Sequence, residues 1–245
     1  MKTVRVALIG AKGRMGQAIA AAAGTAQAVI ISALDQGDDL EKGIDGGDVI
    51  IDFSHPAITN EVCGVALKAR KPIVIGTTGH SNAERAVLEK TSQSLPIVLS
   101  PNFSLGINTL FWLTRKTSEM LGEEFDLEIT EVHHRLKKDA PSGTAKKLAE
   151  ILSDVRKLDY RTNTKHGREG LVGERPVTEI GIHSIRGGDV VGDHTVMFVG
   201  HGERVELTHR ASSREGFARG ALRAAHWIVG RPAGLYSMED VVGCR

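Results

Sequence analysis

The chain has 245 residues, and its 31 Lys and Arg nearly balance its 30 Asp and Glu, for a formal net charge of +1. A near-neutral chain lacks the surplus positive charge that nucleic acid attracts, so we expect no nucleic-acid partner. No apolar run is long enough to span a membrane, and Cys63 and Cys244 lie too far apart in sequence to suggest a disulfide framework. We therefore expect no membrane partner and a cytoplasmic location.

The first feature along the chain is a strand followed by a glycine loop and a helix. Val4–Ile9 is mostly apolar and predicts a strand, residues 10–16 carry three glycines, and residues 17–23 favour a helix. In dinucleotide-binding folds such glycines permit a tight turn, close approach of a pyrophosphate to the backbone, and close packing of helix on strand. A plain glycine turn is the alternative interpretation.

The second strand adds an acidic residue at the position that the same fold requires. Ala28–Leu34 predicts this strand, and Asp35 follows it, where a carboxylate would bind the adenosine ribose. Asp35 would repel a 2'-phosphate, and Gln36 offers no positive charge to offset that repulsion. Lys12 and Arg14 add positive charge nearby. We expect NADH to be preferred, or NADH and NADPH to be used alike.

Strands and helices continue to alternate up to residue 99. Strands are expected at residues 48–53, 72–75 and 96–99, and helices at 58–70 and 82–93, whereas the short crossover 35–49 should hold little or no helix. This alternation predicts a Rossmann-like, doubly wound parallel sheet, which places the fold in the α/β class. Three strand ends carry small polar residues that should line a nicotinamide: Asp52-Phe53-Ser54, Gly76-Thr77-Thr78-Gly79 and Ser100-Pro101-Asn102-Phe103.

The second half of the chain has a different pattern. After a helix at residues 105–121 and a strand at 126–132, strands are expected at 177–185, 190–199 and 204–208. Glycine-containing turns at 186–189 and 200–203 join these last strands, so we expect a second α+β domain built on a mostly antiparallel sheet. Residues 157–174 read as a loop. The amphipathic stretch 217–229 should return to the first domain. The predicted domains are therefore 1–104, completed by 215–245, and 105–214.

The stretch from Glu131 to Ala145 carries the strongest chemical signal. His133 and His134 stand at the end of a predicted strand, where successive side chains point to opposite sides, so we expect them to have different roles. Pro141 suits the first turn of a helix that begins close to Ser142-Gly143-Thr144, and a helix N-terminus of this kind binds carboxylate or phosphate. Lys137 adds a positive charge. This pattern predicts a site for an anionic substrate.

Other interpretations of this stretch remain open. A His-His pair can be a surface feature, three cations can form a solvated basic loop, and Pro-Ser-Gly-Thr can be an ordinary helix cap. A zinc site would need three or four ligands at recognisable spacing, and no Cys or acidic residue stands at such a spacing here. We therefore expect no metal.

Several motifs together resemble one family. They are Gly10-Ala11-Lys12-Gly13-Arg14-Met15-Gly16, Gly76 to Gly79, Asn102-Phe103-Ser104-Leu105-Gly106, Glu131 through Ala145, Gly192-Asp193-His194-Thr195 and Ala211-Ser212-Ser213-Arg214. In this order, over nearly the whole chain, they resemble the 4-hydroxy-tetrahydrodipicolinate reductase family, also called dihydrodipicolinate reductase. The run that starts at His133 is highly specific, whereas the glycine loop is not.

The resemblance implies an enzyme that transfers a hydride from NADH or NADPH to a cyclic dicarboxylate, 4-hydroxy-tetrahydrodipicolinate, in lysine and diaminopimelate biosynthesis. It implies that His133 is the proton donor or acceptor, that Lys137 is a second donor, and that His134, Gly143 and Thr144 hold the substrate. It also implies a homotetramer. The residues that it assigns to the cofactor are Gly10, Ala11, Lys12, Gly13, Arg14, Met15, Asp35, Gly76, Thr77, Thr78, Ser100, Pro101, Asn102 and Phe103.

Two other functions keep the same architecture. A binding module that senses the ratio of NADH to NAD would need the glycine loop and Asp35 but not the residues from His133 to Thr144. A reductase of another small carboxylic acid is the second alternative. Its acylating members would need a nucleophilic cysteine, and neither Cys63, inside a predicted helix, nor Cys244, near the end of the sequence, stands in a suitable place.

Overall fold

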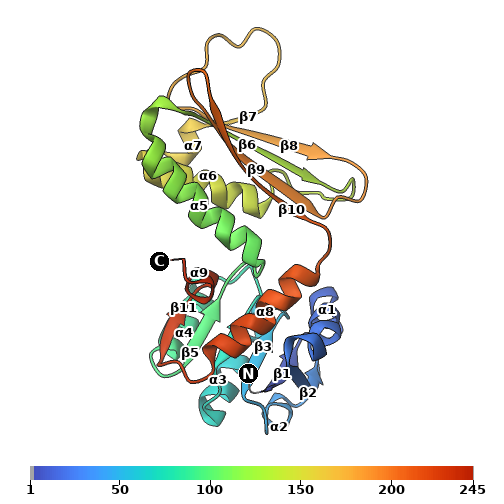
Figure 1. Cartoon of the computed structure of the whole chain (residues 1–245). Helices are drawn as coiled ribbons and strands as arrows, with labels where there is room; N and C mark the ends of the chain where they lie inside the picture. The colour runs from blue at the N-terminus through green and yellow to red at the C-terminus, as the bar shows by residue number, and fades with distance from the viewer. Residues whose placement is uncertain (1–2, 245) are drawn as a thin grey trace. The chain divides into compact units, whose positions relative to one another are not determined.

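The computed structural model describes residues 3–244, which form two compact units. The first unit comprises the described residues up to Leu105 and those from Arg214 onward, and the second unit is Gly106–Ser213. Figure 1 shows that the chain leaves the first unit through α5 (Leu105–Leu121) and re-enters it through α8 (Glu215–Ile228).

The first unit is built on a six-stranded sheet with the order β11-β5-β4-β3-β1-β2. Every neighbouring pair is parallel. The strands are β1 (Val4–Ile9), β2 (Ala28–Leu34), β3 (Val49–Asp52), β4 (Ile73–Ile75), β5 (Pro96–Leu99) and β11 (Gly234–Tyr236). Because the strands are parallel, their carboxyl ends meet at one edge, and this is where ligands bind in such sheets.

Helices cover both faces of this sheet, because its central strands are apolar on both sides. Val6 and Leu8 of β1 pack with residues of α1 (Arg14–Ala22), α8 and α9 (Met238–Val242). Ala7 and Ile9 pack with residues of α2 (Leu40–Gly43), α3 (Thr59–Ala69) and α4 (Asn82–Ser92). The prediction of a doubly wound parallel sheet is confirmed. Helix α2 is a single turn, as expected for the short crossover.

The second unit contains a five-stranded mixed sheet with the order β10-β9-β6-β8-β7. Strands β6 and β9, and β9 and β10, pair antiparallel, whereas β6 and β8, and β7 and β8, pair parallel. The strands are β6 (Asp126–His133), β7 (Thr164–His166), β8 (Ile180–Arg186), β9 (Gly192–Val199) and β10 (Arg204–Ala211). Residues of α5 and α6 (Gly143–Arg156) form the core with one face of this sheet.

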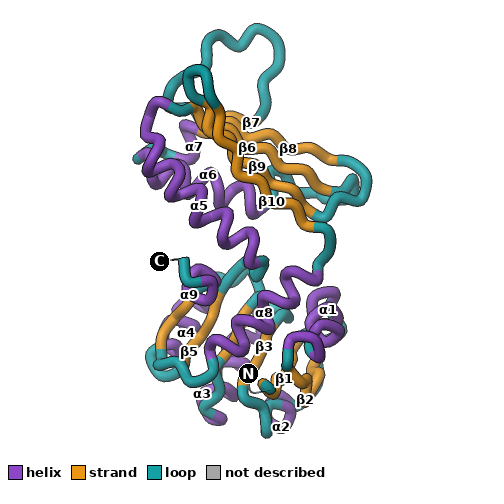
Figure 2. The backbone as a smooth tube through the Cα atoms, viewed as in Figure 1, coloured by secondary structure: helices purple, strands orange, loops and turns teal. Residues whose placement is uncertain are grey.

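Three expectations for the second unit need correction. The turn at 186–189 does not join neighbouring strands, because β6 lies between β8 and β9 in the sheet. Residues 157–174 are not one loop, since they include α7 (Tyr160–Asn163) and the edge strand β7, and the long loop drawn in Figure 2 is 167–179. Pro141 lies before the helix rather than in its first turn, because Ser142 is the N-cap of α6.

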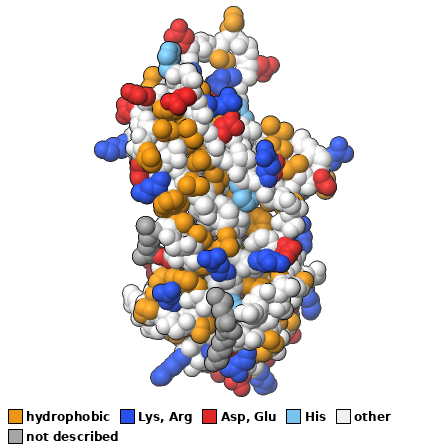
Figure 3. All heavy atoms as spheres, viewed as in Figure 1, with side chains coloured by type: hydrophobic (Ala, Val, Ile, Leu, Met, Phe, Trp, Pro, Cys, Tyr) orange, Lys and Arg blue, Asp and Glu red, His pale blue; other side chains and the backbone are white. Residues whose placement is uncertain are grey.

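The distribution of charged side chains on the surface agrees with the near-neutral composition. Positive and negative side chains are interspersed on the face drawn in Figure 3. None of the helices in the described part of the chain combines the length and apolar character of a membrane span. Among residues 3–244, no group of three His, Cys, Asp or Glu side chains is arranged to hold a metal ion.

Candidate active site

In the glycine loop after β1, the backbone leaves no room for a side chain at two of the glycines. Gly10 has a φ of +80°, and a Cβ at this residue would lie 2.4 Å from the Phe53 carbonyl oxygen. A Cβ at Gly16 would lie 2.2 Å from the Gly10 carbonyl oxygen, because α1 packs closely against the loop. Gly13 is the N-cap of α1 and brings no side chain to the N–H groups of its first turn. The loop therefore fits a phosphate-bearing group better than any side chain.

Asp35 stands beside this loop. Its Oδ2 accepts a hydrogen bond from the Lys12 backbone N–H at 2.7 Å, and this bond lowers the pKa of the carboxyl group. Asp35, Gly10 and Gly13 line a cavity of about 600 Å³ together with residues that follow β3, including Phe53 and Ser54. An ionised carboxylate thus lies where the fold binds a ribose.

Short polar contacts form at the ends of β3, β4 and β5. The Thr77 hydroxyl accepts a hydrogen bond from the Ser54 backbone N–H at 2.9 Å, and the Ser100 hydroxyl donates to the Asn102 carbonyl at 2.8 Å. The Phe103 ring is buried and lies 5.3 Å from the Phe53 ring, centroid to centroid. The Phe103 side chain therefore belongs to the core, and only its backbone is left for a ligand. Pro101 is exposed, whereas Thr77 and Ser100 are buried.

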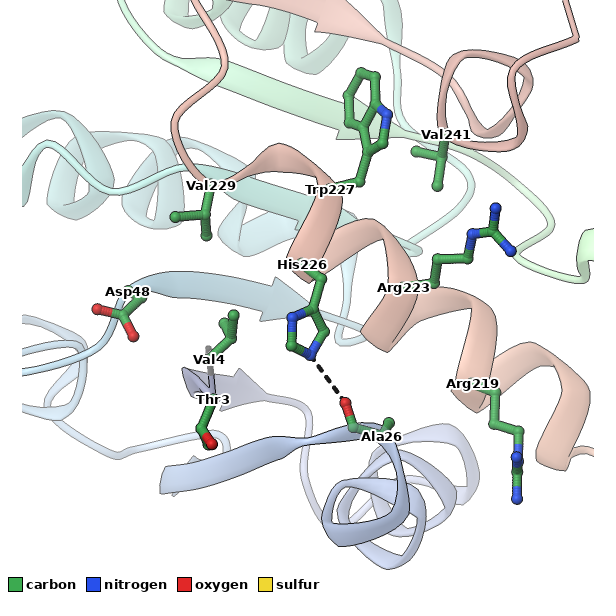
Figure 4. Close-up of a pocket in the computed structure, with 10 residues that line it drawn as sticks. All are labelled: Thr3, Val4, Ala26, Asp48, Arg219, Arg223, His226, Trp227, Val229 and Val241. Atoms are coloured by element: carbon green, nitrogen blue, oxygen red, sulfur yellow. Dashed lines mark hydrogen bonds between the residues drawn. The ribbon is translucent and has the colours of Figure 1, made fainter. Parts of the chain in front are cut away.

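A larger cavity of about 770 Å³ lies at the other end of the same sheet. Figure 4 shows its lining, which includes Val4 at the start of β1, Ala26 before β2 and Asp48 before β3. The α8 residue His226 bonds the Ala26 carbonyl across it at 2.9 Å. These are the amino ends of the strands, so this cavity is not where a doubly wound sheet holds its nucleotide.

In the second unit, β6 presents Glu131 and His133 on its buried face. The strand alternates in burial, so both continue the row of Leu127 and Ile129. Glu131 Oε2 lies 2.5 Å from His133 Nδ1, and Arg186 grips both carboxylate oxygens of Glu131 at 2.8 Å. Burial opposes ionisation, but hydrogen bonds from Arg186, His133 and Ser184 outweigh it and lower the pKa of Glu131 to about 2. Glu131 is therefore an anion at neutral pH.

The ionised Glu131 fixes the chemistry of the imidazole. An anionic carboxylate only accepts hydrogen bonds, so Nδ1 of His133 carries the proton and Nε2 is left for proton exchange. A Cβ at residue 192 would lie 3.0 Å from this Nε2. Gly192 therefore leaves room beside this nitrogen.

Lys137 and the start of α6 are each held by a carboxylate, Lys137 by Asp139 and the helix start by Glu131. The Lys137 ammonium group bonds both oxygens of Asp139, at 2.9 and 3.0 Å, and the Ser142 backbone N–H donates to Glu131 Oε1 at 3.2 Å. Gly143 and Thr144 are the first residues of α6, where the partial positive charge of a helix N-terminus is concentrated. The structure thus brings His133, Lys137, Gly143 and Thr144 to one side of the second unit through contacts with Glu131 and its neighbours.

His194 lies next to His133, with ring centroids 5.2 Å apart. Burial, together with the charge of His133, lowers the pKa of His194 to about 3, so His194 is neutral at physiological pH. Its Nε2 lies 3.0 Å from the Ser142 hydroxyl, which in turn accepts the Ala145 N–H as the cap of α6. His194 therefore helps to fix the start of the helix.

His134 follows the last residue of β6. Its backbone N–H donates to the Val190 carbonyl at 2.7 Å, and its buried Nδ1 has no hydrogen-bond partner within residues 3–244. A buried polar atom of this kind is normally satisfied by some partner, which here leaves a place for a ligand group.

Sequence reasoning gave no individual role to Glu131, Arg186 or His194, and it named Ser142 only as part of the helix start. Glu131 and Ser142 lie inside the informative stretch, two residues before His133 and one before Gly143, and alternation along the strand was the available signal for Glu131. Arg186 and His194 became visible only through the sheet, because β6 pairs with β8 at His133 and Arg186 and with β9 at Glu131 and His194.

The fold and these two groups of residues define a class: a two-unit oxidoreductase with a dinucleotide-binding sheet and a second unit that carries a buried Glu131–His133 pair. Residues 4–103 match the family described as dihydrodipicolinate reductase, N-terminus, and residues 106–242 match dihydrodipicolinate reductase, C-terminus. The chain therefore belongs to the dihydrodipicolinate reductase family, whose members are NAD(P)H-dependent enzymes of lysine and diaminopimelate biosynthesis.

Curated relatives agree with this assignment. The 4-hydroxy-tetrahydrodipicolinate reductase of Akkermansia muciniphila is 53% identical over 241 residues, 98% of this chain and 98% of the relative. That of Trichlorobacter lovleyi is 43% identical over 268 aligned positions, 99% of this chain and 100% of the relative. The dipicolinate-bound dihydrodipicolinate reductase from Paenisporosarcina sp. TG-14 has the same fold, with a TM-score of 0.79 at 23% identity over 97% of this chain and 98% of that one.

Proposed function

We propose that this chain reduces 4-hydroxy-tetrahydrodipicolinate to tetrahydrodipicolinate with NADH or NADPH, in the biosynthesis of diaminopimelate and lysine. The observation that carries this proposal is the buried Glu131–His133 pair, in which Nδ1 is held at 2.5 Å and Nε2 is left available beside Gly192. A nucleotide-binding sensor would have no use for such a pair. The family to which the chain belongs supports the same reaction.

The first unit is proposed to bind the cofactor at the carboxyl ends of its strands. The loop from Gly10 to Met15 would hold the phosphates, since the backbone leaves no room for a side chain at Gly10 or Gly16. Residues after β4 and β5, from Gly76 to Thr78 and from Ser100 to Phe103, would border the nicotinamide. When bound, the nicotinamide supplies the hydride.

The cofactor preference is proposed to favour NADH or to be dual. Asp35 is ionised beside the loop, and an anion at this position repels a 2'-phosphate. The neighbouring Gln36 also lines the cavity and carries no charge. Lys12 and Arg14 are exposed and can reduce the repulsion, which is why dual use remains within the proposal. A Michaelis constant for NADPH more than about tenfold below that for NADH would contradict it, since a tenfold difference corresponds to about 1.4 kcal/mol.

In the second unit, His133 is proposed to deliver the proton that balances hydride addition. The 4-hydroxyl group of the substrate leaves as water, which gives the conjugated ring. Addition of hydride to this ring builds negative charge on carbon or nitrogen, which a proton must quench, and an imidazole can donate one at neutral pH. Glu131 keeps Nδ1 protonated, so Nε2 exchanges the proton with substrate. Lys137, held by Asp139, is the second candidate donor and can also stabilise the developing charge.

The substrate is proposed to be held by its carboxylates. The N-terminus of α6 at Gly143 and Thr144 offers backbone N–H groups and a hydroxyl to one carboxylate, and the unsatisfied Nδ1 of His134 offers a further polar contact. The solved relative bound to dipicolinate supports a dicarboxylate ligand for this fold. The homotetramer and the cytoplasmic location stay predictions of the family resemblance and the composition.

A coupled assay tests this proposal. Purified protein is mixed with pyruvate, aspartate semialdehyde and a dihydrodipicolinate synthase, and the absorbance of NADH or NADPH is followed. We expect oxidation only when the synthase is present, and the two cofactor rates measure the preference. If neither cofactor is oxidised although both bind, the reductase proposal fails, and the sensor or a reductase of another small acid takes its place.

A further inference from the structure

Arg186 occupies a position from which one guanidinium reaches two separate parts of the second unit. It is the last residue of β8, opposite His133 in the parallel pairing with β6. Its Nη1 and Nη2 grip the two carboxylate oxygens of Glu131, each at 2.8 Å. Nη2 also donates to the backbone carbonyl of Asp139 at 2.7 Å. One side chain thus contacts both β6 and the loop that follows β6.

The first branch of this contact leads to His133. Glu131 is completely buried, so its negative charge depends on the cation beside it. With that charge in place, Glu131 Oε2 holds His133 Nδ1 at 2.5 Å and sets both the ring orientation and the tautomer. The same logic operates wherever a buried carboxylate orients a catalytic imidazole.

The second branch leads to Lys137. The Asp139 carboxylate bonds the Lys137 ammonium group at 2.9 Å, and the Asp139 carbonyl is anchored by Arg186. The Lys137 side chain is only 20% exposed, so this arrangement holds it close to the protein rather than in solvent. Contacts of Arg186 therefore lead to both candidate proton donors, His133 and Lys137.

We propose that Arg186 is a positioning residue for the reaction, which sets His133 through Glu131 and Lys137 through Asp139 without touching substrate. This inference rests on the proposed function of His133 and Lys137. The planar fork of arginine is essential to it, because a lysine ammonium cannot bond two carboxylate oxygens and a carbonyl in one plane.

The contrasting role would be purely structural, as an ion pair that stabilises the sheet. The same strand offers a matched control for that role. Glu128 of β6 also bonds an arginine, Arg168, and a histidine, His183, but on the opposite face of the strand and away from His133. Arg168→Met therefore removes one of the two arginines that bond Glu128, leaving Arg175 at 3.0 Å, without altering either candidate donor.

The experiment compares Arg186→Met, Arg186→Lys and Arg168→Met with the unchanged enzyme. We measure kcat, the Kd of NADH, the melting temperature and the ¹⁵N NMR signals of the His133 ring at a pH where it is neutral. For Arg186→Met we expect kcat to fall about 10- to 100-fold, as when outer-shell partners of a functional histidine are removed, with the Kd of NADH unchanged. The His133 ring should lose its single Nδ1–H tautomer. Arg168→Met should lower only the melting temperature.

Arg186→Lys separates geometry from charge. We expect it to recover most of the melting temperature but little of kcat, since it keeps the cation and loses the fork. The proposal is overturned if Arg186→Met keeps the kcat and tautomer of the unchanged enzyme, or if Arg186→Lys restores kcat. If Arg186→Met does not fold, the kcat and tautomer of Arg186→Lys decide in the same way. The tautomer is read without substrate, so the two failures are distinguishable: an unchanged enzyme that is inactive in the coupled assay is a failure of the proposed function, whereas an unaltered tautomer in Arg186→Met is a failure of this inference.

Discussion

The two units build their candidate sites from different parts of the polypeptide. In the first unit the backbone forms the site, at a turn where a Cβ on Gly10 would lie 2.4 Å from a carbonyl oxygen. In the second unit side chains form it, as Glu131, Arg186 and His133 bond one another across two strands. A backbone site is therefore sensitive to the addition of a methyl group, whereas a side-chain site is sensitive to the removal of a charge or a proton carrier.

The largest effect is expected from removing the proton carrier of the second unit. His133→Gln should lower kcat by roughly 10²- to 10⁴-fold, the range of general acid catalysis, and leave the Kd of NADH unchanged because the glycine loop is intact. Steady-state rates and cofactor titration measure both. His183→Gln, which removes the histidine beside Glu128, is the control and should keep kcat. Equal turnover in His133→Gln and the unchanged enzyme would remove His133 from the mechanism.

The next effect should be confined to the first unit. Gly10→Ala forces a side chain into a left-handed conformation that costs roughly 1–2 kcal/mol, and the contact with the Phe53 carbonyl adds to that cost. We expect a lower melting temperature and loss of NADH binding by calorimetry. Gly64→Ala, in the middle of α3 with open space around its Cβ, is the control and should bind NADH normally. Normal NADH binding by Gly10→Ala would show that the loop is not the phosphate site.

The pH dependence of stability separates the buried charges of the second unit. His194 has a pKa of about 3 in the folded state, below its ordinary 6.5, so the unfolded chain takes up a proton that the folded chain does not. The stability that neutral His194 contributes is fully present above pH 6.5. As the pH falls below 6.5, the free energy of unfolding decreases by up to about 1.4 kcal/mol per pH unit.

Urea unfolding between pH 4.5 and 6.5 tests this assignment. Glu131 does not interfere in this range, because its pKa is lowered from 4.5 to about 2, so the stability that its ionised form contributes is lost only below pH 4.5. His194→Asn should show a shallower pH dependence than the unchanged protein. Burial also lowers the pKa of His209, but that residue is present in both proteins. Two parallel curves would mean that His194 is not the group that titrates.

The smallest effect is expected at the proposed substrate clamp. Thr144→Val removes a hydroxyl from the start of α6, and loss of a hydrogen bond to a carboxylate should raise the KM for substrate about tenfold. The kcat should change little, since neither candidate proton donor is altered. Thr144→Ser keeps the hydroxyl and is the matched control. A fall in kcat alone would place Thr144 outside the clamp.

Local patterns in the sequence determined most of the first unit. The strand Val4–Ile9, the glycine loop and Asp35 after Ala28–Leu34 are each readable within a few residues, because burial period, turn glycines and strand ends are local properties. The helix start at Ser142 and the strand end at His133 were also predicted. What local patterns missed in the first unit were β11 and α9, which are only 3 and 5 residues long and too short to show a period.

Only the tertiary structure decided how the second site is assembled. The turn at 186–189 has the composition of a hairpin, yet β6 inserts between β8 and β9 and pairs with both. That insertion places Arg186 beside Glu131 and His194 beside His133, over separations of more than fifty residues. Strand order is set by the burial of whole faces of the sheet, which no local pattern encodes, so the sequence identified the histidine but not the residues that orient it.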